Sequence, residues 1–428
     1  MKIKSYDSIG EQVCSERLAN GLTVFVIPKR GFSKSYAFFA TRYGGADRRF
    51  RHGGRWIDTP EGVAHFLEHK MFDTKDGNAL SALSANGASP NAFTSTDITA
   101  YYFEAVEKFQ ENLRMLLSFV SVPYFTAESV EKEQGIIGQE IKMGDDDPDY
   151  VLYYGLMKAL YKCHPLRDSV AGTVESISRI TPETLYSCHK VFYNPSNMVL
   201  CAVGDLDPEA VFSTARSVLP DEPGEIPSRD YGEDEEPEAF TDRFDQQMEV
   251  SMPLFMIGYK LTPPQRGRNT LLSNLTGELA LRLIAGGTSP LYARLYEEGL
   301  INSSFGCGCE MSADRMHAVF SGESSRPDDV FAALKEEIGR ACSDGFDLSY
   351  FERIKRAFTG KIIRGLNSFE GIAYGYADGY FHGYDCFESA DTLNTIKPDD
   401  VVSYIRDELT DSRSAIAVIS PVSKSENA

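Results

Sequence analysis

The first half of the chain alternates between short stretches with a hydrophobic period of two and longer stretches with a helical period. Residues 22–27 (LTVFVI) and 36–41 (YAFFAT) flank a Lys-Arg-Gly turn and indicate two strands. The pattern further predicts helices at residues 108–120, 127–143, 150–162 and 208–218, and strands at 91–105 and 198–204. Strands grouped around helices, without strict strand–helix alternation, are typical of an α+β fold with antiparallel strands.

The chain changes character between residues 220 and 247, where it is acidic, carries four prolines and has little apolar periodicity. We interpret residues 221–247 as an exposed linker between domains, the alternative being a long surface loop within one domain. The linker would separate a first half at 1–220 from a second half at 248–428.

The second half resembles the first in outline. Strands are predicted at 255–261, 317–322 and 414–419, helices at 269–284, at 328–343 and from residue 349, and a helix–turn–strand block at 291–305. A chain of 428 residues is too long for a single core. We therefore expect an α+β fold of two similar halves, each a mostly antiparallel sheet packed with helices.

The composition limits which binding partners and which cellular compartment are expected. The chain has 43 basic against 63 acidic residues, a formal net charge of −20, which argues against nucleic acid and anionic membranes as partners. It contains no apolar run long enough for a signal peptide or a membrane span. Its eight cysteines are scattered, with one close pair at 307 and 309, and we interpret them as reduced thiols of a cytoplasmic protein.

The strongest candidate for chemistry is the run His65-Phe66-Leu67-Glu68-His69. On a helix, residues four apart lie on one face, so the two imidazoles can bind one divalent metal ion. Glu68 projects from the same side and can take a proton from a metal-bound water. H-x-x-E-H is the inverzincin pattern. The alternative is an exposed helix that carries two histidines and a glutamate by chance.

A catalytic zinc site needs a third protein ligand, and the best candidate lies in the amphipathic stretch 127–142. Glu133 and Glu140 are seven residues, or two helical turns, apart on one face of this predicted helix. The alternative is that both glutamates only solvate an acidic helix surface, which is the usual role of such charges.

Together these motifs resemble the insulinase, pitrilysin and mitochondrial-processing-peptidase family. The likeness covers nearly the whole chain and includes GVAHFLEHKMF (62–72), NAFTSTDITAYYFEA (91–105), VEKEQGIIGQEI (130–141), CHPLRDSVAGTVESISRIT (163–181) and FYNPSNMVLCAVGDLDPEAV (192–211). It implies a bacterial zinc endopeptidase with the bi-domain architecture of the processing peptidases, in which only the first half holds metal. Peptides or unfolded protein segments would be its substrates.

The resemblance also assigns roles to the candidate residues. It implies that His65, His69 and Glu140 bind one Zn²⁺ per chain and that Glu68 is the general base. Glu133 would be a carboxylate that supports the site from behind the ligands.

The strand around Asn91, Ala92, Phe93 and Thr94 is a candidate for substrate binding. If this strand is a sheet edge beside the metal, its free backbone groups can pair with an extended peptide. The alternative is an interior strand with only a packing role, and the residues alone do not separate the two. The resemblance favours substrate binding.

One segment departs from the family pattern. Many members carry an arginine and a tyrosine seven residues apart, which bind substrate and stabilise the oxyanion. In the matching segment here, Tyr296 stands near the arginine position and Asn302 at the tyrosine position, while Ile301 lies seven residues after Arg294. The chain therefore resembles the small bacterial members that act as pairs, and we expect a homologous partner chain to supply the Arg/Tyr pair in a heterodimer, a homodimer being possible.

Three functions remain to be distinguished. The first is a zinc endopeptidase that works inside a chamber formed by two chains. The second is a catalytically silent structural subunit of a processing-peptidase-like complex, although such subunits usually lose a metal-site residue and the motif here is complete. The third is a metal-binding or regulatory protein unrelated to peptidases.

Overall fold

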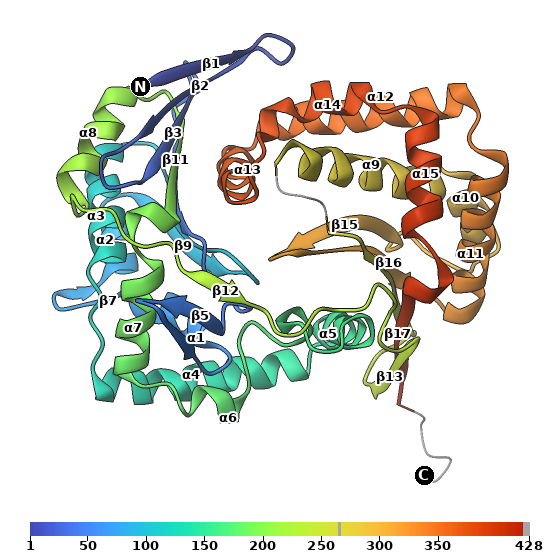
Figure 1. Cartoon of the computed structure of the whole chain (residues 1–428), viewed down its shortest axis with the longest axis horizontal. Coiled ribbons are helices and arrows are strands. Elements are labelled where there is room, and N and C mark those ends of the chain that lie inside the picture. The colour runs from blue at the N-terminus through green and yellow to red at the C-terminus, as the bar shows by residue number, and fades with distance from the viewer. Residues whose placement is uncertain (264–266, 423–428) are drawn as a thin grey trace. The chain divides into compact units, whose positions relative to one another are not determined.

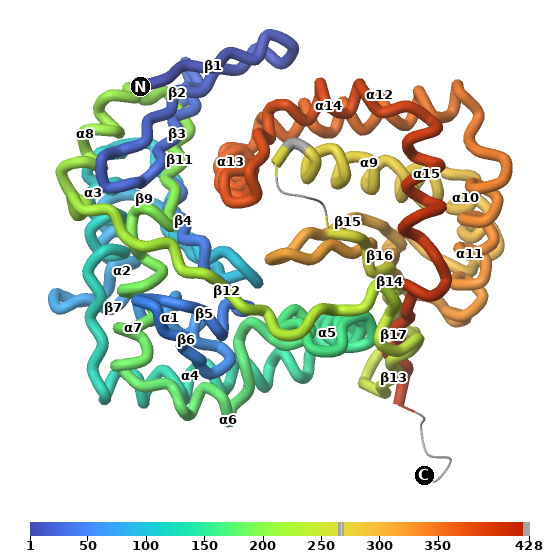
Figure 2. The backbone as a smooth tube through the Cα atoms, viewed as in Figure 1, coloured from blue at the N-terminus to red at the C-terminus, as the bar shows by residue number. Residues whose placement is uncertain are grey.

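The computed structural model describes residues 1–263 and 267–422. The chain forms two compact units that are interleaved in sequence (Figures 1 and 2). Unit 1 consists of Met1–Ile141, Ser169–Tyr231 and Ile363–Glu388, and unit 2 consists of Lys142–Asp168, Gly232–Ile362 and Ser389–Ala428. The units therefore differ from the expected division into residues 1–220 and 248–428, because each half contributes one segment to the other unit.

Unit 1 is built on a seven-stranded sheet. Its order is β1 (Lys2–Tyr6), β2 (Glu11–Arg17), β3 (Thr23–Pro28), β11 (Met198–Gly204), β4 (Ser35–Thr41), β10 (Thr99–Ala105) and β9 (Ala88–Thr94). Neighbouring strands are antiparallel except β3 and β11, which are parallel. Strand β9 lies at one edge of this sheet.

Both faces of this sheet are apolar, as the central strand β11 shows. Leu200 and Ala202 point into a core shared with most of the helices of unit 1, whereas Val199, Cys201 and Val203 point into a core on the opposite face. The helices of unit 1 are α1 (Val63–Met71), α2 (Ala79–Ala85), α3 (Phe109–Ser121), the first part of α4 (Ala127–Asp145), α6 (Val174–Ile177), α7 (Pro182–Phe192), α8 (Pro208–Val218) and α13 (Phe369–His382). Helix α13 covers the opposite face, against β11 and β4.

Unit 2 contains a five-stranded sheet of the order β13 (Arg243–Met248), β17 (Ser414–Pro421), β14 (Leu254–Leu261), β16 (Arg315–Glu323) and β15 (Gly306–Ser312). All its strand pairs are antiparallel except β13 with β17. Its helices are α5 (Pro148–Leu160), α9 (Arg268–Ala285), α10 (Pro290–Glu297), α11 (Pro327–Asp344), α12 (Leu348–Gly365), α14 (Ser389–Thr395) and α15 (Pro398–Glu408). The prediction of an α+β fold of two similar units is confirmed.

The interleaving has a simple structural cause. Helix α5, from the first half of the chain, packs on strands β17, β14 and β13 of unit 2. Helix α13, from the second half, packs on β11 and β4 of unit 1. Each sheet thus has its second apolar face covered by a helix from the other half of the sequence, as a sheet that is apolar on both sides requires.

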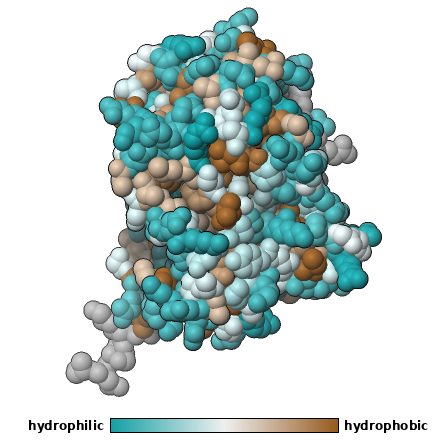
Figure 3. All heavy atoms as spheres, turned by 90° about the vertical axis from the view of Figure 1, so that its left-hand side faces the viewer, coloured by the Kyte–Doolittle hydropathy of each residue, from teal (hydrophilic) through white to brown (hydrophobic). Residues whose placement is uncertain are grey.

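Short elements complete the structure. They are the strands β5 (Arg49–His52), β6 (Arg55–Asp58), β7 (Asp73–Thr74), β8 (Gly77–Asn78) and β12 (Ser228–Asp230), and the 3₁₀ turns Pro165–Arg167, Pro195–Asn197, Cys386–Glu388 and Asp411–Arg413. The surface view in Figure 3 is mainly hydrophilic, with small hydrophobic patches. In the described part of the chain, no helix is both long and apolar enough to cross a bilayer.

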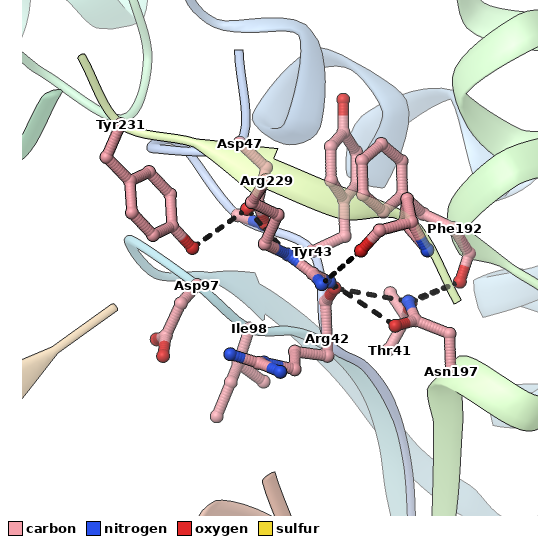
Figure 4. Close-up of polar contacts among 12 residues, drawn as sticks. Thr41, Arg42, Tyr43, Asp47, Asp97, Ile98, Phe192, Asn197, Arg229 and Tyr231 are labelled. Carbon is pink, nitrogen blue, oxygen red and sulfur yellow. Dashed lines mark hydrogen bonds and ion pairs between the residues drawn. The ribbon is translucent and has the colours of Figure 1, made fainter. Parts of the chain in front are cut away.

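The acidic segment 221–247 is largely exposed, but it is not a free linker. Its strand β12 pairs with β5 in unit 1 and its strand β13 pairs with β17 in unit 2. Figure 4 shows how β12 is held: the Nε atom of Arg229 lies 2.8 Å from Oδ1 of the buried Asp47, and the Tyr231 hydroxyl donates to the same oxygen. Burial raises the pKa of Asp47 to about 6 despite the opposing charge of Arg229. The segment does lead from unit 1 to unit 2, with the boundary between Tyr231 and Gly232, but strand pairing anchors it on both sides. Apolar periodicity does not reveal such backbone pairing.

Candidate metal centre

Helix α1 presents the H-x-x-E-H residues from a buried position. It begins after Gly62, whose φ of 88° and close approach to the Ala171 carbonyl both require glycine: a Cβ atom would lie 2.5 Å from that oxygen. The apolar side chains of α1 are packed in the core of unit 1. His65 and His69 lie one turn apart, with ring centroids separated by 4.6 Å.

Helix α4 brings Glu140 to these two histidines. Its Oε1 atom lies 3.4 Å from Nε2 of His65 and its Oε2 atom lies 3.6 Å from Nε2 of His69. One ligand atom from each residue can be chosen so that all three lie within 4.8 Å of one another. In the described part of the chain this is the one group of His, Cys, Asp or Glu residues close enough to hold a metal ion.

The donor set fits zinc. Two imidazole nitrogens and one carboxylate oxygen are typical of catalytic zinc sites, which keep a fourth position open. The side chains of His65, His69 and Glu140 are 12%, 26% and 48% exposed, so the cluster is reachable from solvent. The hydrogen bond with His65 and the charges of both histidines hold the pKa of Glu140 below its usual range, so this carboxylate is ionised at neutral pH.

Glu133 lies behind the cluster and contacts His69. The Nδ1 atom of His69 lies 3.0 Å from Oε1 of Glu133, and this hydrogen bond leaves Nε2 free for a metal ion. Burial alone would raise the pKa of Glu133, but the hydrogen bond and nearby positive charges outweigh it and lower that pKa. Glu133 thus contacts a predicted metal ligand, and its supporting role stays a prediction of the family resemblance.

Lys70 is a member of this site that sequence reasoning missed. Its side chain is 1% exposed, and its Nζ atom lies 3.8 Å from Oε2 of Glu133 and forms an ion pair with Asp73. A lysine is buried only when it is paired, so Lys70 supplies a fixed positive charge beside Glu133. Its position directly after His69 was the signal available, but lysine is normally exposed and its burial cannot be read from the sequence.

Glu68 is not part of the ligand cluster and has its own partner. The hydroxyl of Thr94 donates a 2.7 Å hydrogen bond to Oε2 of Glu68, which is 9% exposed. Burial raises the pKa of Glu68, although this hydrogen bond and the two histidines oppose the shift. Thr94 is predicted to bind substrate through its backbone, which lies on strand β9. Its hydroxyl has a separate contact, with Glu68.

Strand β9 is the sheet edge that the substrate hypothesis requires. Among the described residues it pairs with β10 on one side and with no strand on the other. Asn91 is exposed, and its side-chain oxygen accepts the backbone N–H of Ala92. Phe93 packs against the aromatic rings of Phe38 and Tyr102. The contact between Thr94 and Glu68 places the end of this edge beside the cluster.

The segment that departs from the family pattern lies in unit 2. Arg294 is exposed, with an ion-pair distance of 3.9 Å to Glu298, and Tyr296 is 54% exposed. Ile301 is buried, and the amide nitrogen of Asn302 donates a 2.6 Å hydrogen bond to Glu323. No arginine–tyrosine pair with the family spacing occurs in this segment.

Comparison with known proteins decides the family. Residues 52–174 match the family model described as Insulinase (Peptidase family M16), and residues 179–358 match the model described as Peptidase M16 inactive domain. The uncharacterized zinc protease YmfH of Bacillus subtilis (strain 168) is 38% identical, over 98% of this chain and 99% of the relative. This chain belongs to peptidase family M16.

Solved structures share the fold of this chain. The crystal structure of an M16-like peptidase from Alicyclobacillus acidocaldarius superposes with a TM-score of 0.92 and 31% identity, covering 96% of this chain and 99% of that chain. Pitrilysin superposes with a TM-score of 0.76 and 18% identity, covering 97% of this chain but 46% of its own. The H-x-x-E-H motif lies within the insulinase match and has no counterpart in the part matched by the inactive-domain model.

Proposed function

We propose that this M16 chain is a zinc-dependent endopeptidase that hydrolyses peptides or unfolded protein segments inside a chamber formed by two chains. The observation that carries the proposal is the convergence of His65, His69 and Glu140 from two helices, with Glu68 beside them but outside the ligand set. Unit 1, which contains His65, His69 and Glu140, would supply catalysis, and unit 2 would be the part without metal. Each chain would hold one zinc ion.

The residues in and around the cluster would have different roles in hydrolysis. A zinc ion held there would supply Lewis-acid catalysis of amide cleavage. Glu68 would take the proton of the attacking water and pass it to the leaving amine, and burial, which raises the pKa of Glu68, favours this role in proton transfer. The Thr94 hydroxyl fixes the orientation of Glu68, and Glu133 fixes that of His69.

The substrate would bind as an added strand along the free edge of β9. Backbone hydrogen bonds to residues Asn91–Thr94 would give affinity without demanding one side-chain sequence. Such pairing needs an extended peptide, so a folded protein would be a substrate only where a segment unfolds. The negative net charge of the chain favours basic or neutral peptides over acidic ones.

A partner chain would complete the site. The segment 294–304 in the C-terminal half lacks the arginine–tyrosine pair, and the chain covers slightly less than half of pitrilysin, a chain about twice its length. A second M16 chain could supply the missing length and the oxyanion donors. We propose a heterodimer with a homologous chain that carries the pair, with a homodimer as the other possibility, in a bacterial cytoplasm.

Cleavage of a quenched fluorescent peptide library tests the proposal, with the chain alone and with its homologous partner added. We expect weak or no turnover by the chain alone and robust turnover by the pair. Mutating the partner's arginine or tyrosine should abolish the turnover by the pair. Robust turnover by the purified monomer, followed across a size-exclusion peak, would refute the two-chain chamber. A zinc-loaded pair that cleaves no peptide would favour the silent structural subunit.

A further inference from the structure

Two buried histidines occupy equivalent places in the two units. In unit 1, His382 ends helix α13 and lies against Asp97, in the turn between β9 and β10. In unit 2, His164 follows helix α5 and lies against Asp314, in the turn between β15 and β16. In both units the helix comes from the other half of the sequence, and the turn belongs to the hairpin that carries the edge strand. Only the hairpin of unit 1 contacts Glu68.

His382 lies between two carboxylates. Its Nε2 atom is 3.2 Å from Oδ2 of Asp97, and its Nδ1 atom is 3.1 Å from Oδ1 of Asp378. Burial disfavours the charged ring, but the two carboxylates outweigh burial and raise the pKa of His382 to about 10. The ring is therefore a buried cation at neutral pH, and Asp97, itself 6% exposed, has it as an ion-pair partner.

The turn that carries Asp97 is held on a second side by backbone contacts. The N–H groups of Gly45 and Ala46 donate to the carbonyls of Ser95 and Thr96, at 3.0 and 2.8 Å. Gly44 packs so closely that a Cβ atom there would lie 2.3 Å from the Asp97 nitrogen. Three residues before Asp97, strand β9 ends at Thr94, the residue that donates to Glu68.

We propose that His382 is a positioning residue for the active site. Its ion pair with Asp97 fixes the end of β9, and this strand carries both the Thr94 hydroxyl and the edge assigned to the substrate. Loss of the ion pair between His382 and Asp97 should therefore displace both the Thr94 hydroxyl and the bound substrate. His382 itself contacts neither Thr94 nor the substrate. The expected effect of His382 on turnover rests on the proposed function. Its effect on the mobility of strand β9 can be measured without any activity.

Hydrogen–deuterium exchange of the zinc-loaded full-length chain tests the structural step. In His382→Ala, the amides of residues 91–99 should exchange about tenfold faster or more, the scale expected when a buried ion pair loses one partner. Asp97→Asn should give the same change from the other side of the contact. His382→Gln, which keeps a side-chain donor, should recover part of the protection.

His164→Ala is the matched control, since it removes a buried histidine with the same kind of aspartate contact at the equivalent hairpin. It should speed exchange at residues 306–316 and leave 91–99 unchanged. Turnover by the chain with its partner, normalised to bound zinc, should show a lower kcat and a higher KM for His382→Ala but wild-type values for His164→Ala. A purely structural role would lower the yield of folded protein and leave both constants unchanged.

The outcomes separate this inference from the proposed function. Unchanged exchange at 91–99 in both His382→Ala and Asp97→Asn overturns the positioning role, whatever the activity. Faster exchange with wild-type kcat and KM also overturns it. If the wild-type pair cleaves nothing, the proposed function fails, and the exchange data alone decide whether His382 holds β9.

Discussion

Glu133 offers a graded test of how the metal centre is supported. Its Oε1 atom accepts the Nδ1–H of His69 at 3.0 Å, and its Oε2 atom lies 3.8 Å from the buried Lys70. Glu133→Gln keeps an oxygen that can accept from His69 but loses the negative charge. Glu133→Ala loses both the charge and the acceptor, so the ring of His69 is free to turn.

Removing such a supporting contact typically lowers metal affinity by about tenfold to a hundredfold, or about 1.4 to 2.8 kcal/mol. We expect the loss of zinc affinity in Glu133→Gln to lie near the lower end of this range, because the hydrogen bond to His69 survives. The loss in Glu133→Ala should lie near the upper end. Lys70 keeps its ion pair with Asp73 in both variants, so the fold should be retained.

Competition with a zinc-binding dye measures the affinity, and urea unfolding of the zinc-free proteins measures the fold separately. Glu131→Gln is the control, since it makes the same charge change at an exposed position of the same helix. It should bind zinc as the wild type does. Equal zinc affinity in the wild type and both Glu133 variants, or an equal loss in Glu131→Gln, would refute the role given to Glu133.

Two further predictions concern strand β9 and its anchor. Thr94→Val should lower kcat/KM of the chain-pair about tenfold to a hundredfold, the scale of one hydrogen bond to a charged group, because Glu68 loses its donor. Thr94→Ser should stay near wild type in the same peptide assay, and a loss as large as that of valine would contradict the hydroxyl's role. His382 is flanked by Asp97 and Asp378 and has a raised pKa, so the folded state holds its proton more tightly than the unfolded state. Its stabilising contribution should be full below about pH 6.5 and disappear as the pH rises to about 10. The stability difference between wild type and His382→Gln, measured by urea unfolding, should therefore narrow over this range; a difference that grows with pH would contradict the assignment.

The metal cluster was largely readable from the sequence because helical periodicity fixes which residues share a face. His65, Glu68 and His69 needed only the assumption of a helix. Glu140 needed the family resemblance, since it lies on another helix and no local rule brings the two helices together. Strand β9 was predicted as a strand, but its place at the edge depends on the order of seven strands and so on long-range pairing.

Other features could not be predicted from local pattern. Helix α13 contains glycines at 371, 375 and 379, which lower helix propensity and hid it. Gly379 has a packing role, since a Cβ atom there would lie 2.6 Å from the carbonyl oxygen of Tyr384. The exchange of α5 and α13 between units is equally invisible, because an apolar helix face does not specify which sheet it will cover. The burial of Lys70 follows from tertiary contacts alone.

The proposed function requires that this chain's own metal centre hydrolyses peptide bonds. The most direct test is to purify the chain through a tag from its native cells, together with whatever chain it pairs with, as wild type and as Glu68→Gln. Both complexes should contain about one zinc ion per copy of this chain, because Glu68 is not a ligand. We expect peptide cleavage by the wild-type complex and a loss of about a hundredfold or more in Glu68→Gln. Equal cleavage by the two complexes, or none by either, would contradict it.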